Sequence, residues 1–549
     1  MLKIKRLRWV LTLAVLAGLL GLGAPSLGQD IDPDGWGEIR GPGLVVYTNA
    51  SPERGLEMTL ALERFRAVFA RLAPAIELRS PAPTTVLAFR NAEDFAPYKT
   101  RQDRGNSRIL GQFISHPDGN YLILDAGNHM AGSFAVIVHE FVHYFVRHNF
   151  PGVPLWFNEG LAEYYSTFET TADGVVLGLP VERHVALLKR DGEFSLSELL
   201  GADTRSSSYH RPDQVGHFYA LSWLLVHHLL SSGELDATAD FLARTVSGED
   251  PEDAFEEAFD RRLSDLEEDL ENYFSADELP SAVLTLEGLP GGDDLRARAL
   301  PPADVLYHLG DLLAHTGRAD DAEQHFAVAL DFEPNHADAM AGRALVRDFS
   351  NRFDEAEILY RDALAAGPRH PSSHLYYGRH LLLRAQATAG KGRLGILNDA
   401  RRQLRDALEA MPDYGEAWVL LGKSYLLDSD DLGDGIRAFQ EARDLLPGRF
   451  DILGDLAHLH ARQGQGDMAH RLVDELAIFT DAETASKARD EVERLLLLHA
   501  ADLAFEEGEA ERGLELFDQA IEYARDPRVQ QAMEEQLEGL QERFEASGG

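Results

Sequence analysis

Hydrophobic and polar positions follow two different patterns along the chain. In the first half, short apolar runs are bounded by turn-forming residues, which predicts strands, and from Ser133 onward the apolar spacing is that of amphipathic helices. A helical segment that starts after Ser51, a good N-cap residue, separates the first two runs. We therefore predict an α+β domain over residues 29–275, with its sheet first and its helices after. The expected strands are GLVVYTNA, TTVLAFRN and, on either side of an HPDG turn, ILGQFISH and GNYLILD.

The second half of the chain is periodic. Prolines at 334, 368, 412 and 447 are separated by 34, 44 and 35 residues. Within the first unit, a Leu309-Gly310 pair, Ala322, Phe326 and Ala329 place small residues where paired helices approach and an aromatic ring between them. This pattern resembles tetratricopeptide repeats. The resemblance implies an all-α solenoid over residues 302–549 that binds a protein partner.

The segment between the two halves, residues 276–301, contains prolines, a glycine pair and mixed charges. Such a composition predicts an interdomain linker with at most one short ordered element. The chain is therefore expected to be multidomain.

The start of the chain has the order of a secretory signal peptide. Four basic side chains precede an apolar run over residues 9–22, and small residues follow up to Gly28. This run is short for a membrane span, which needs about 20 residues. We expect cleavage after residues 1–28 and an exported protein, periplasmic or secreted, with no stable membrane span. An uncleaved N-terminal anchor is the lesser alternative.

Charge and cysteine content narrow the possible functions. The formal net charge of −40 over 549 residues argues against a nucleic-acid partner, which requires a basic surface. The chain has no cysteine, which rules out a cysteine nucleophile and thiolate ligands. Any metal ion must therefore be held by histidines and carboxylates.

The candidate chemistry lies in the stretch VIVHEFVHYFVRHNFPGVPLWFNEGLAEYYS. His139, Glu140 and His143 form an H-E-x-x-H motif, and two histidines four residues apart lie on one face of a helix. Glu159 follows after fifteen intervening residues, where a second helix is expected to start near Asn158. The alternative is that these are ordinary polar residues of amphipathic helices. Two histidines, one glutamate and an open position would form a catalytic zinc shell.

The same stretch resembles the gluzincin metallopeptidases, whose peptidase MA-like families carry a W-x-x-E-G-x-A-x-Y segment like that from Trp156 to Tyr164. The resemblance implies a zincin-like fold and one Zn²⁺ ion bound by His139, His143 and Glu159. It also implies that Glu140 is the general base. Glu163 would orient a ligand histidine.

Other roles follow less directly from the resemblance. Tyr219 is the first candidate to stabilise the oxyanion, with Tyr209 or His210 as alternatives. Residues 121–125, YLILD, occupy the place of the edge strand that binds substrate in zincins, but no substrate-binding residue can be named. A G-x-M-E-N motif is not apparent there, which favours an endopeptidase over an aminopeptidase.

The leading hypothesis is an exported zinc metallopeptidase that cleaves a protein or peptide substrate, with a repeat domain that binds a protein. One alternative is a catalytically inactive zincin-like module within a repeat-based binding scaffold. A zinc hydrolase that acts on another kind of bond is a third possibility.

Overall fold

A computed structural model describes residues 32–547 of the chain. The residues left out within this range are 73–79, 101–108, 128–129, 151, 172–173, 192–194, 204–205, 207–210, 212–213, 277, 286 and 429–430. The expected signal peptide, residues 1–28, lies outside the described residues.

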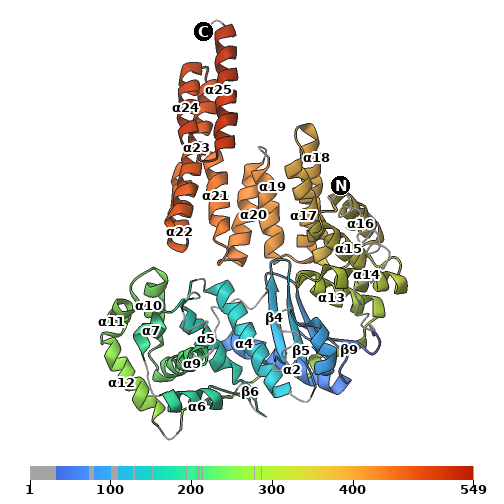
Figure 1. Cartoon of the computed structure of the whole chain (residues 1–549), viewed down its shortest axis with the longest axis vertical. Coiled ribbons are helices and arrows are strands. Elements are labelled where there is room, and N and C mark those ends of the chain that lie inside the picture. Colours follow the sequence, from blue (N-terminus) through green and yellow to red (C-terminus); the bar gives the residue numbers. More distant parts are fainter. Residues whose placement is uncertain are drawn as a thin grey trace, which may run out of the picture. The chain divides into compact units, whose positions relative to one another are not determined.

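A mixed six-stranded sheet lies at the centre of the first domain, in the order β4-β5-β3-β2-β1-β9. Strands β2, β3 and β5 are parallel, whereas β4, β1 and β9 each pair antiparallel with a neighbour. Figure 1 shows the hairpin of β4 and β5 at one side of this sheet. The strands are β1 (Gly37–Arg40), β2 (Val45–Thr48), β3 (Thr84–Phe89), β4 (Gly111–His116), β5 (Gly119–Asp125) and β9 (Arg296–Ala299).

The β4–β5 hairpin forms at the HPDG turn as predicted, with His116 paired to Gly119 across the turn. The segment YLILD does not form the edge of the sheet, however. It belongs to β5, which pairs with β4 on one side and with β3 on the other. Because the hairpin folds β4 back along the outside of β5, β4 becomes the edge strand.

The two faces of the sheet are covered by different parts of the chain. In β3, Val86 and Ala88 belong to one core, and Leu87 and Phe89 belong to another. The first core contains helices α2 (Pro52–Leu72) and α4 (Met130–Asn149). The second core contains α13 (Pro302–His315), the first helix of the repeat region. Strand β5 is buried at every position because both of its faces are covered.

Helices and a small second sheet complete the first domain. The sheet has the order β6-β7-β8. Its strands are β6 (Glu169–Thr170), β7 (Gly174–Leu177) and β8 (Ala282–Thr285). The remaining helices are α3 (Ala92–Phe95), η1 (Ala96–Tyr98), α5 (Leu155–Ser166), α6 (Glu182–Asp191), α7 (Leu196–Leu200), α9 (Val215–Ser232), α10 (Leu235–Val246), α11 (Pro251–Phe259), α12 (Leu263–Phe274) and η2 (Gly292–Asp294).

Residues 276–301, predicted to be a linker, are part of the first domain instead. Strand β8 pairs with β7, and β9 pairs with β1 as an edge of the large sheet. Leu300, directly after β9, is buried in the core that α13 completes. The sequence RARA of β9 lacks large apolar residues because the strand is exposed, and Arg298 on it pairs with Glu38 of β1. A hydrophobic pattern therefore could not identify this strand.

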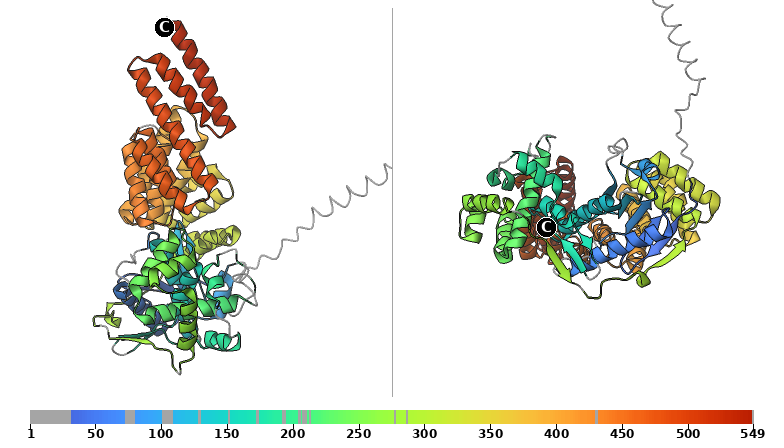
Figure 2. Two further views of the ribbon diagram at one scale, coloured as in Figure 1. Left: turned by 90° about the vertical axis from the view of Figure 1, so that its left-hand side faces the viewer. Right: turned by 90° about the horizontal axis from the view of Figure 1, so that it is seen from below.

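The second half of the chain forms successive helix pairs, as predicted, and Figure 2 shows these pairs in chain order. Gly310 explains the small residues of the pattern, because a Cβ atom there would lie 2.8 Å from the Phe326 ring. The pairs are α13 with α14 (Ala319–Phe332), α15 (Ala337–Phe349) with α16 (Phe353–Ala366), α17 (Pro371–Ala387) with α18 (Lys391–Ala410), α19 (Gly415–Leu426) with α20 (Leu432–Leu445), α21 (Asp451–Arg462) with α22 (Gly466–Phe479) and α23 (Ala482–Glu506) with α24 (Ala510–Glu522), and α25 (Pro527–Ser547) follows.

Within the described part of the chain, every helix is too short or too polar to span a bilayer.

Candidate metal centre

Helix α4 carries the H-E-x-x-H motif on one side and core residues on the other. Val138 and Val142 are fully buried, and the stacked rings of Phe141 and Phe145 pack with the helix α2 core. This amphipathic arrangement fixes the rotation of the helix. The polar residues of the motif are therefore held at the opposite face, where they are only partly buried.

Helix α5 brings Glu159 toward α4. The helix begins at Leu155, directly after Pro154, and so starts earlier than predicted. Trp156 is completely buried and anchors this first turn. At Gly160, a Cβ atom would lie 2.2 Å from the carbonyl oxygen of Ser222, so only glycine allows α5 to lie this close to α9. The close packing of α5 against α9 thus explains why a glycine follows Glu159 in the sequence.

Three donor atoms from these two helices converge on one point. The Nε2 atoms of His139 and His143 are 3.0 Å apart. The Oε2 atom of Glu159 lies 3.2 Å from Nε2 of His143 and 3.8 Å from Nε2 of His139. All three atoms lie within 4.8 Å of one another, close enough to bind a single ion. Two imidazoles and one carboxylate match the ligand preference of Zn²⁺ and leave a coordination position open.

Each histidine of the centre has a partner at its other ring nitrogen. Asn158 Oδ1 lies 3.0 Å from Nδ1 of His143, and Oε1 of Glu163 lies 3.8 Å from Nδ1 of His139. The Asn158 contact is at hydrogen-bonding distance and orients the ring of His143 so that Nε2 faces an ion. Glu163 is too far from His139 for a hydrogen bond and acts on this ring through its charge. Glu163 thus lies beside His139, and its role in orienting a ligand remains a prediction. Asn158, near which the second helix was expected to start, also contacts a candidate ligand.

Helix α6 supplies two residues that the sequence did not suggest. Arg183 Nη2 donates hydrogen bonds of 2.7 and 2.8 Å to the two carboxylate oxygens of Glu163, and His184 Nε2 lies 3.1 Å from Glu163 Oε2. Burial alone would raise the pKa of Glu163. The hydrogen bond from His184 and the charges of His139, His184 and Arg183 outweigh burial and lower this pKa to about 2. Glu163 is therefore ionised at neutral pH.

The two histidines differ in how their surroundings affect their pKa. Burial, followed by the charge of His143, lowers the pKa of His139 to about 4. Burial also acts to lower the pKa of His143, but the hydrogen bond and the charge of Glu159 outweigh it and raise the pKa. A neutral imidazole is the form that binds a metal, and His139 has that form at neutral pH.

A cavity of about 840 Å³ opens beside the candidate metal centre. His139, Glu140 and Glu163 line one part of it. Tyr219 of α9 and both Arg183 and His184 of α6 also line it. The structure therefore places Glu140 and Tyr219 at the same cavity, whereas Tyr209 and His210 lie outside the described residues.

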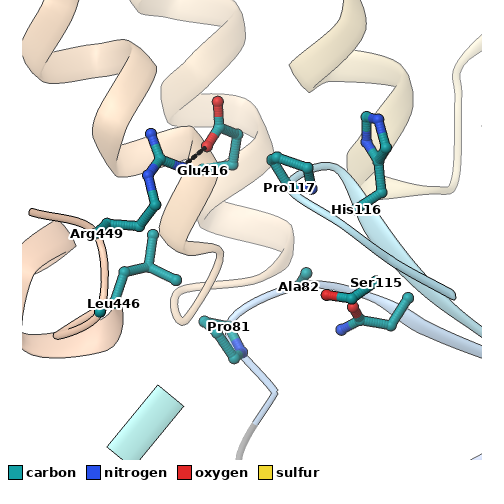
Figure 3. A pocket seen from close by; sticks show the side chains of 10 residues that line it. Pro81, Ala82, Ser115, His116, Pro117, Glu416, Leu446 and Arg449 are labelled. Atoms are coloured by element: carbon teal, nitrogen blue, oxygen red, sulfur yellow. Dashed lines mark hydrogen bonds and ion pairs between the residues drawn. The ribbon is translucent and has the colours of Figure 1, made fainter. Parts of the chain in front are cut away.

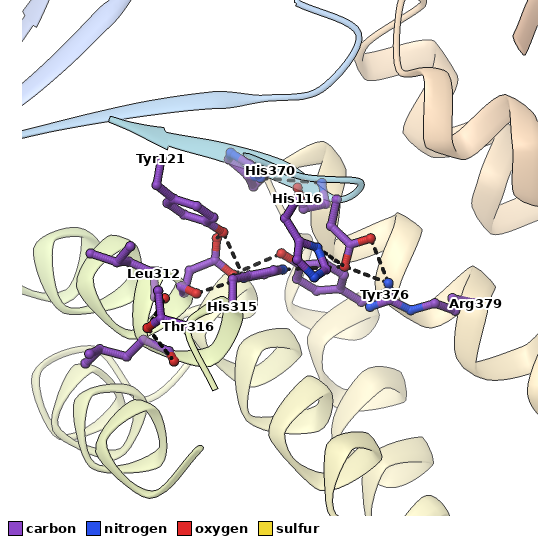
Figure 4. A network of polar contacts seen from close by, with 12 residues as sticks. His116, Tyr121, Leu312, His315, Thr316, His370, Tyr376 and Arg379 are labelled. Atoms are coloured by element: carbon purple, nitrogen blue, oxygen red, sulfur yellow. Dashed lines mark hydrogen bonds and ion pairs between the residues drawn. The ribbon is translucent and has the colours of Figure 1, made fainter. Parts of the chain in front are cut away.

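A second set of possible ligand atoms belongs to His116, Asp118 and His315. Here Arg379 Nη1 donates to both carboxylate oxygens of Asp118, at 2.7 and 2.6 Å. A cation at this point would compete with a guanidinium for the same carboxylate. We therefore describe this set as an ion-pair network, which Figure 4 shows between the β4–β5 hairpin and the repeat helices.

Comparison with known proteins identifies the repeats. A family model described as tetratricopeptide repeat matches residues 293–338 and 392–449. The Arabidopsis thaliana protein CTR9 homolog is 31% identical over 180 residues, 32% of this chain and 16% of that protein. The cellulose synthase operon protein C of Xanthomonas axonopodis pv. citri (strain 306) is 30% identical over 207 residues, 36% of this chain and 13% of that protein. The chain thus spans less than a fifth of the length of either relative.

Two solved structures are similar to part of the chain. YrrB, a TPR protein with an unusual peptide-binding site, is 20% identical with a TM-score of 0.29 and matches 34% of this chain and 91% of its own. PilF of Pseudomonas aeruginosa is 19% identical with a TM-score of 0.29 and matches 43% of this chain and 97% of its own. The match of the family model confirms a tetratricopeptide-repeat region.

Proposed function

We propose that this chain is a zinc-dependent metallopeptidase whose tetratricopeptide repeats bind a protein partner. The convergence of His139, His143 and Glu159 on one point carries the proposal. Glu140 lies on the same helix and lines the adjoining cavity, which a general base must reach. The basic and apolar start of the chain supports export to the periplasm or the medium.

The residues of the site have separate roles in peptide hydrolysis. A Zn²⁺ ion bound by His139, His143 and Glu159 would supply a Lewis acid at the wall of the cavity. Glu140 accepts a proton from the attacking water and returns it to the leaving amine. Tyr219, which lines the same cavity, would donate to the negative oxygen that forms on the scissile carbonyl. Glu163 and Asn158 hold the two imidazole rings in position.

The cavity could take a segment of a polypeptide substrate. Its lining combines side chains of α4, α5, α6 and α9, so a polypeptide bound there would contact several elements at once. We propose endopeptidase activity, because the sequence lacks an apparent motif for a free amino terminus.

A repeat-based protein-binding scaffold with an inactive first domain is the second candidate. The comparisons favour it, because the family match lies in the repeat region and tetratricopeptide repeats bind proteins. The presence of Glu140 next to His139 on α4, in the lining of the adjoining cavity, favours the enzyme instead.

Zinc binding and peptide hydrolysis separate the two candidates. We expect one zinc ion per chain by elemental analysis and cleavage of a broad peptide library. The substitution Glu140→Gln removes the proton acceptor but none of the three ligands, so we expect hydrolysis to fall at least about 100-fold while zinc is retained. Glu169→Gln, at an exposed position of β6, is the matched control and should leave both properties unchanged.

The outcomes are distinct. A zinc-loaded wild-type protein that cleaves no peptide would leave the scaffold as the better candidate. A protein that is purified without zinc and does not take it up would contradict both the metal centre and the peptidase.

A further inference from the structure

The repeats contact the first domain through the tip of the β4–β5 hairpin. Asp118 lies at this tip and is almost completely buried. Besides accepting hydrogen bonds from Arg379 of α17, its carboxylate lies 3.4 Å from Nε2 of His315 at the end of α13. The backbone carbonyl of Asp118 accepts a hydrogen bond from the hydroxyl of Tyr414, directly before α19. One hairpin residue thus contacts the first and the third helix pairs and the residue that directly precedes the fourth.

A second point of contact lies on β5 itself. Tyr121 donates a hydrogen bond of 2.6 Å to Oδ2 of Asp311 on α13, and Tyr376 of α17 donates one of 2.9 Å to Oδ1 of the same carboxylate. Figure 4 shows Tyr121 and His315 pointing toward one another from β5 and α13. All of these polar groups are buried, so their pairing is needed to offset desolvation.

These contacts fall on one row of repeat helices. We call α13, α15, α17, α19, α21 and α23 the first-helix row, because each is the first helix of its pair and contacts the next member of the row. Such a row forms the extended surface with which helical repeats bind their ligands. In this protein, α13, α17 and the start of α19 are in contact with the hairpin, the sheet or the residues beside them.

The contact also leads to the metal helix. The backbone N–H of Gly415, the first residue of α19, donates a hydrogen bond of 2.8 Å to the carbonyl of Pro81. Next to Pro81, Ser80 Oγ lies 2.6 Å from the hydroxyl of Tyr144, the residue that follows His143 on α4. Asn120 of the hairpin donates to the same Ser80 oxygen at 3.1 Å.

Apolar packing supports the same connection. Phe113 of β4 lies against two rings of α4, at 5.9 Å from Phe141 and 5.1 Å from Tyr144 between ring centroids. A displacement of the hairpin would therefore remove both a hydrogen-bonded and an apolar contact from α4.

The hairpin contact ends at a cavity of about 230 Å³, which Figure 3 shows between Pro117 at the hairpin tip and Leu446 after α20. Arg449 on its far wall pairs with Glu416 and with Asp451, at 3.1 and 2.8 Å. The guanidinium is thus engaged within the repeats. The cavity lies between the hairpin on one side and α19 with the segment after α20 on the other.

From these contacts we infer that the β4–β5 hairpin is an intramolecular ligand of the first-helix row from α13 to α19 and that this contact positions the metal helix α4. A foreign protein that bound this part of the row would have to displace the hairpin, so a partner has the later helices α21 and α23 available. The inference rests on the proposed function only in the measurements of zinc affinity.

Hydrogen–deuterium exchange of the full-length protein tests the contact. Arg379→Met removes the charge that pairs with Asp118 but keeps the aliphatic stem. We expect amide exchange to rise about 2- to 30-fold in residues 111–125 and in α4, with no change in α22–α25. Arg384→Met is the matched control, because Arg384 lies on the same helix but pairs with Glu357 inside the repeats.

The substitution Tyr144→Phe tests the connection to α4 without altering the repeats. It removes the hydroxyl that contacts Ser80, so exchange should rise in α4 but not at Asp118 or in α17. Zinc affinity, measured by competition with a chelator, should fall about 3- to 30-fold in both Tyr144→Phe and Arg379→Met.

Each result supports or overturns a separate part of the inference. Unchanged exchange at the hairpin in Arg379→Met would overturn the intramolecular ligand. Faster exchange at the hairpin with unchanged exchange in α4 would overturn the positioning of the metal helix. If the wild-type protein binds no zinc, the proposed function fails, but the exchange measurements still decide the inference.

Discussion

At the scale of single residues, buried charges in this protein are usually paired. Burial would raise the pKa of Asp118, but the charge of Arg379 and the hydrogen bonds from His315 and Arg379 hold it well below its usual range. Asp455 of α21 is different. Burial raises its pKa to about 6, and the positive charges of Lys423 and Arg449 offset only part of this effect. The later part of the first-helix row therefore carries a carboxyl group whose charged form is unfavourable at neutral pH.

This buried carboxylate gives a pH-dependent stability. Because the pKa of Asp455 is higher in the folded protein than the value near 3.9 of an unfolded chain, its contribution is present at low pH and is lost as the pH rises through about 6. Asp455→Asn avoids this loss. We expect this substitution to raise the free energy of unfolding more at pH 8 than at pH 5. The difference between the two effects should be roughly 1–3 kcal/mol. Urea denaturation at both pH values measures the difference.

The control for Asp455 is Asp518→Asn, at an exposed position on α24. It should change stability equally at both pH values. An Asp455→Asn effect that is the same at pH 5 and pH 8 would contradict the prediction.

How far individual site residues can be predicted depends on their separation in the sequence. His139 and His143 face one point because residues four apart share a helix face. Glu159 joins them because its helix follows closely in the chain. Arg183 and His184 come from α6, and no local pattern indicates that this helix packs beside Glu163. Contacts of that kind are set by tertiary packing.

At the scale of elements, the metal centre depends on how closely α5 approaches α9. Gly160→Ala would place a Cβ atom 2.2 Å from the Ser222 carbonyl and 2.6 Å from Cγ2 of Val226. Because α5 would have to move away, we expect a loss of about 1–3 kcal/mol in unfolding free energy and weaker zinc binding. Thermal or urea unfolding and a chelator competition measure the two effects.

Gly539→Ala on α25 is the matched control for this substitution. A Cβ atom there would meet only the end of the Arg543 side chain, at 3.9 Å. Alanine is the better helix former, so this variant should gain about 0.5–1 kcal/mol. Equal effects of the two substitutions would show that packing against α9 is not limiting.

Elements with a strong hydrophobic period were predictable, and elements without one were not. The hairpin strands, α2 and α4 lie where the apolar pattern places them. Strands β8 and β9 escaped prediction because they are short and largely exposed and are held by pairing with distant strands. Helix α5 begins before Asn158 because Pro154 and the buried Trp156 fix its first turn.

At the scale of the whole molecule, the expected boundary between the two domains does not divide the hydrophobic core. The sheet face that carries Leu87, Phe89 and Ile123 packs against Val305, Leu309 and Leu312 of α13. The repeat pattern predicted the solenoid correctly, but it could not show that the first repeat helix also completes the core of the preceding sheet.

Truncation tests this shared core. Removal of residues 302–549 would expose the second face of the sheet, so we expect an aggregating product that binds a hydrophobic dye and lacks near-ultraviolet circular dichroism. Removal of residues 482–549 takes away only α23–α25 and should leave a soluble protein with the fold of the sheet intact. A soluble fragment 1–301 with native circular dichroism would contradict the shared core.

Helix α13 belongs to two cores at once, and this limits how the length of the array can change during evolution. A helix pair inserted or lost next to α13 would shift Asp311, His315 and Arg379 out of register with the hairpin. After α20 no such register has to be kept with the β4–β5 tip. Gain and loss of repeats among related chains should therefore be concentrated at the carboxyl-terminal end.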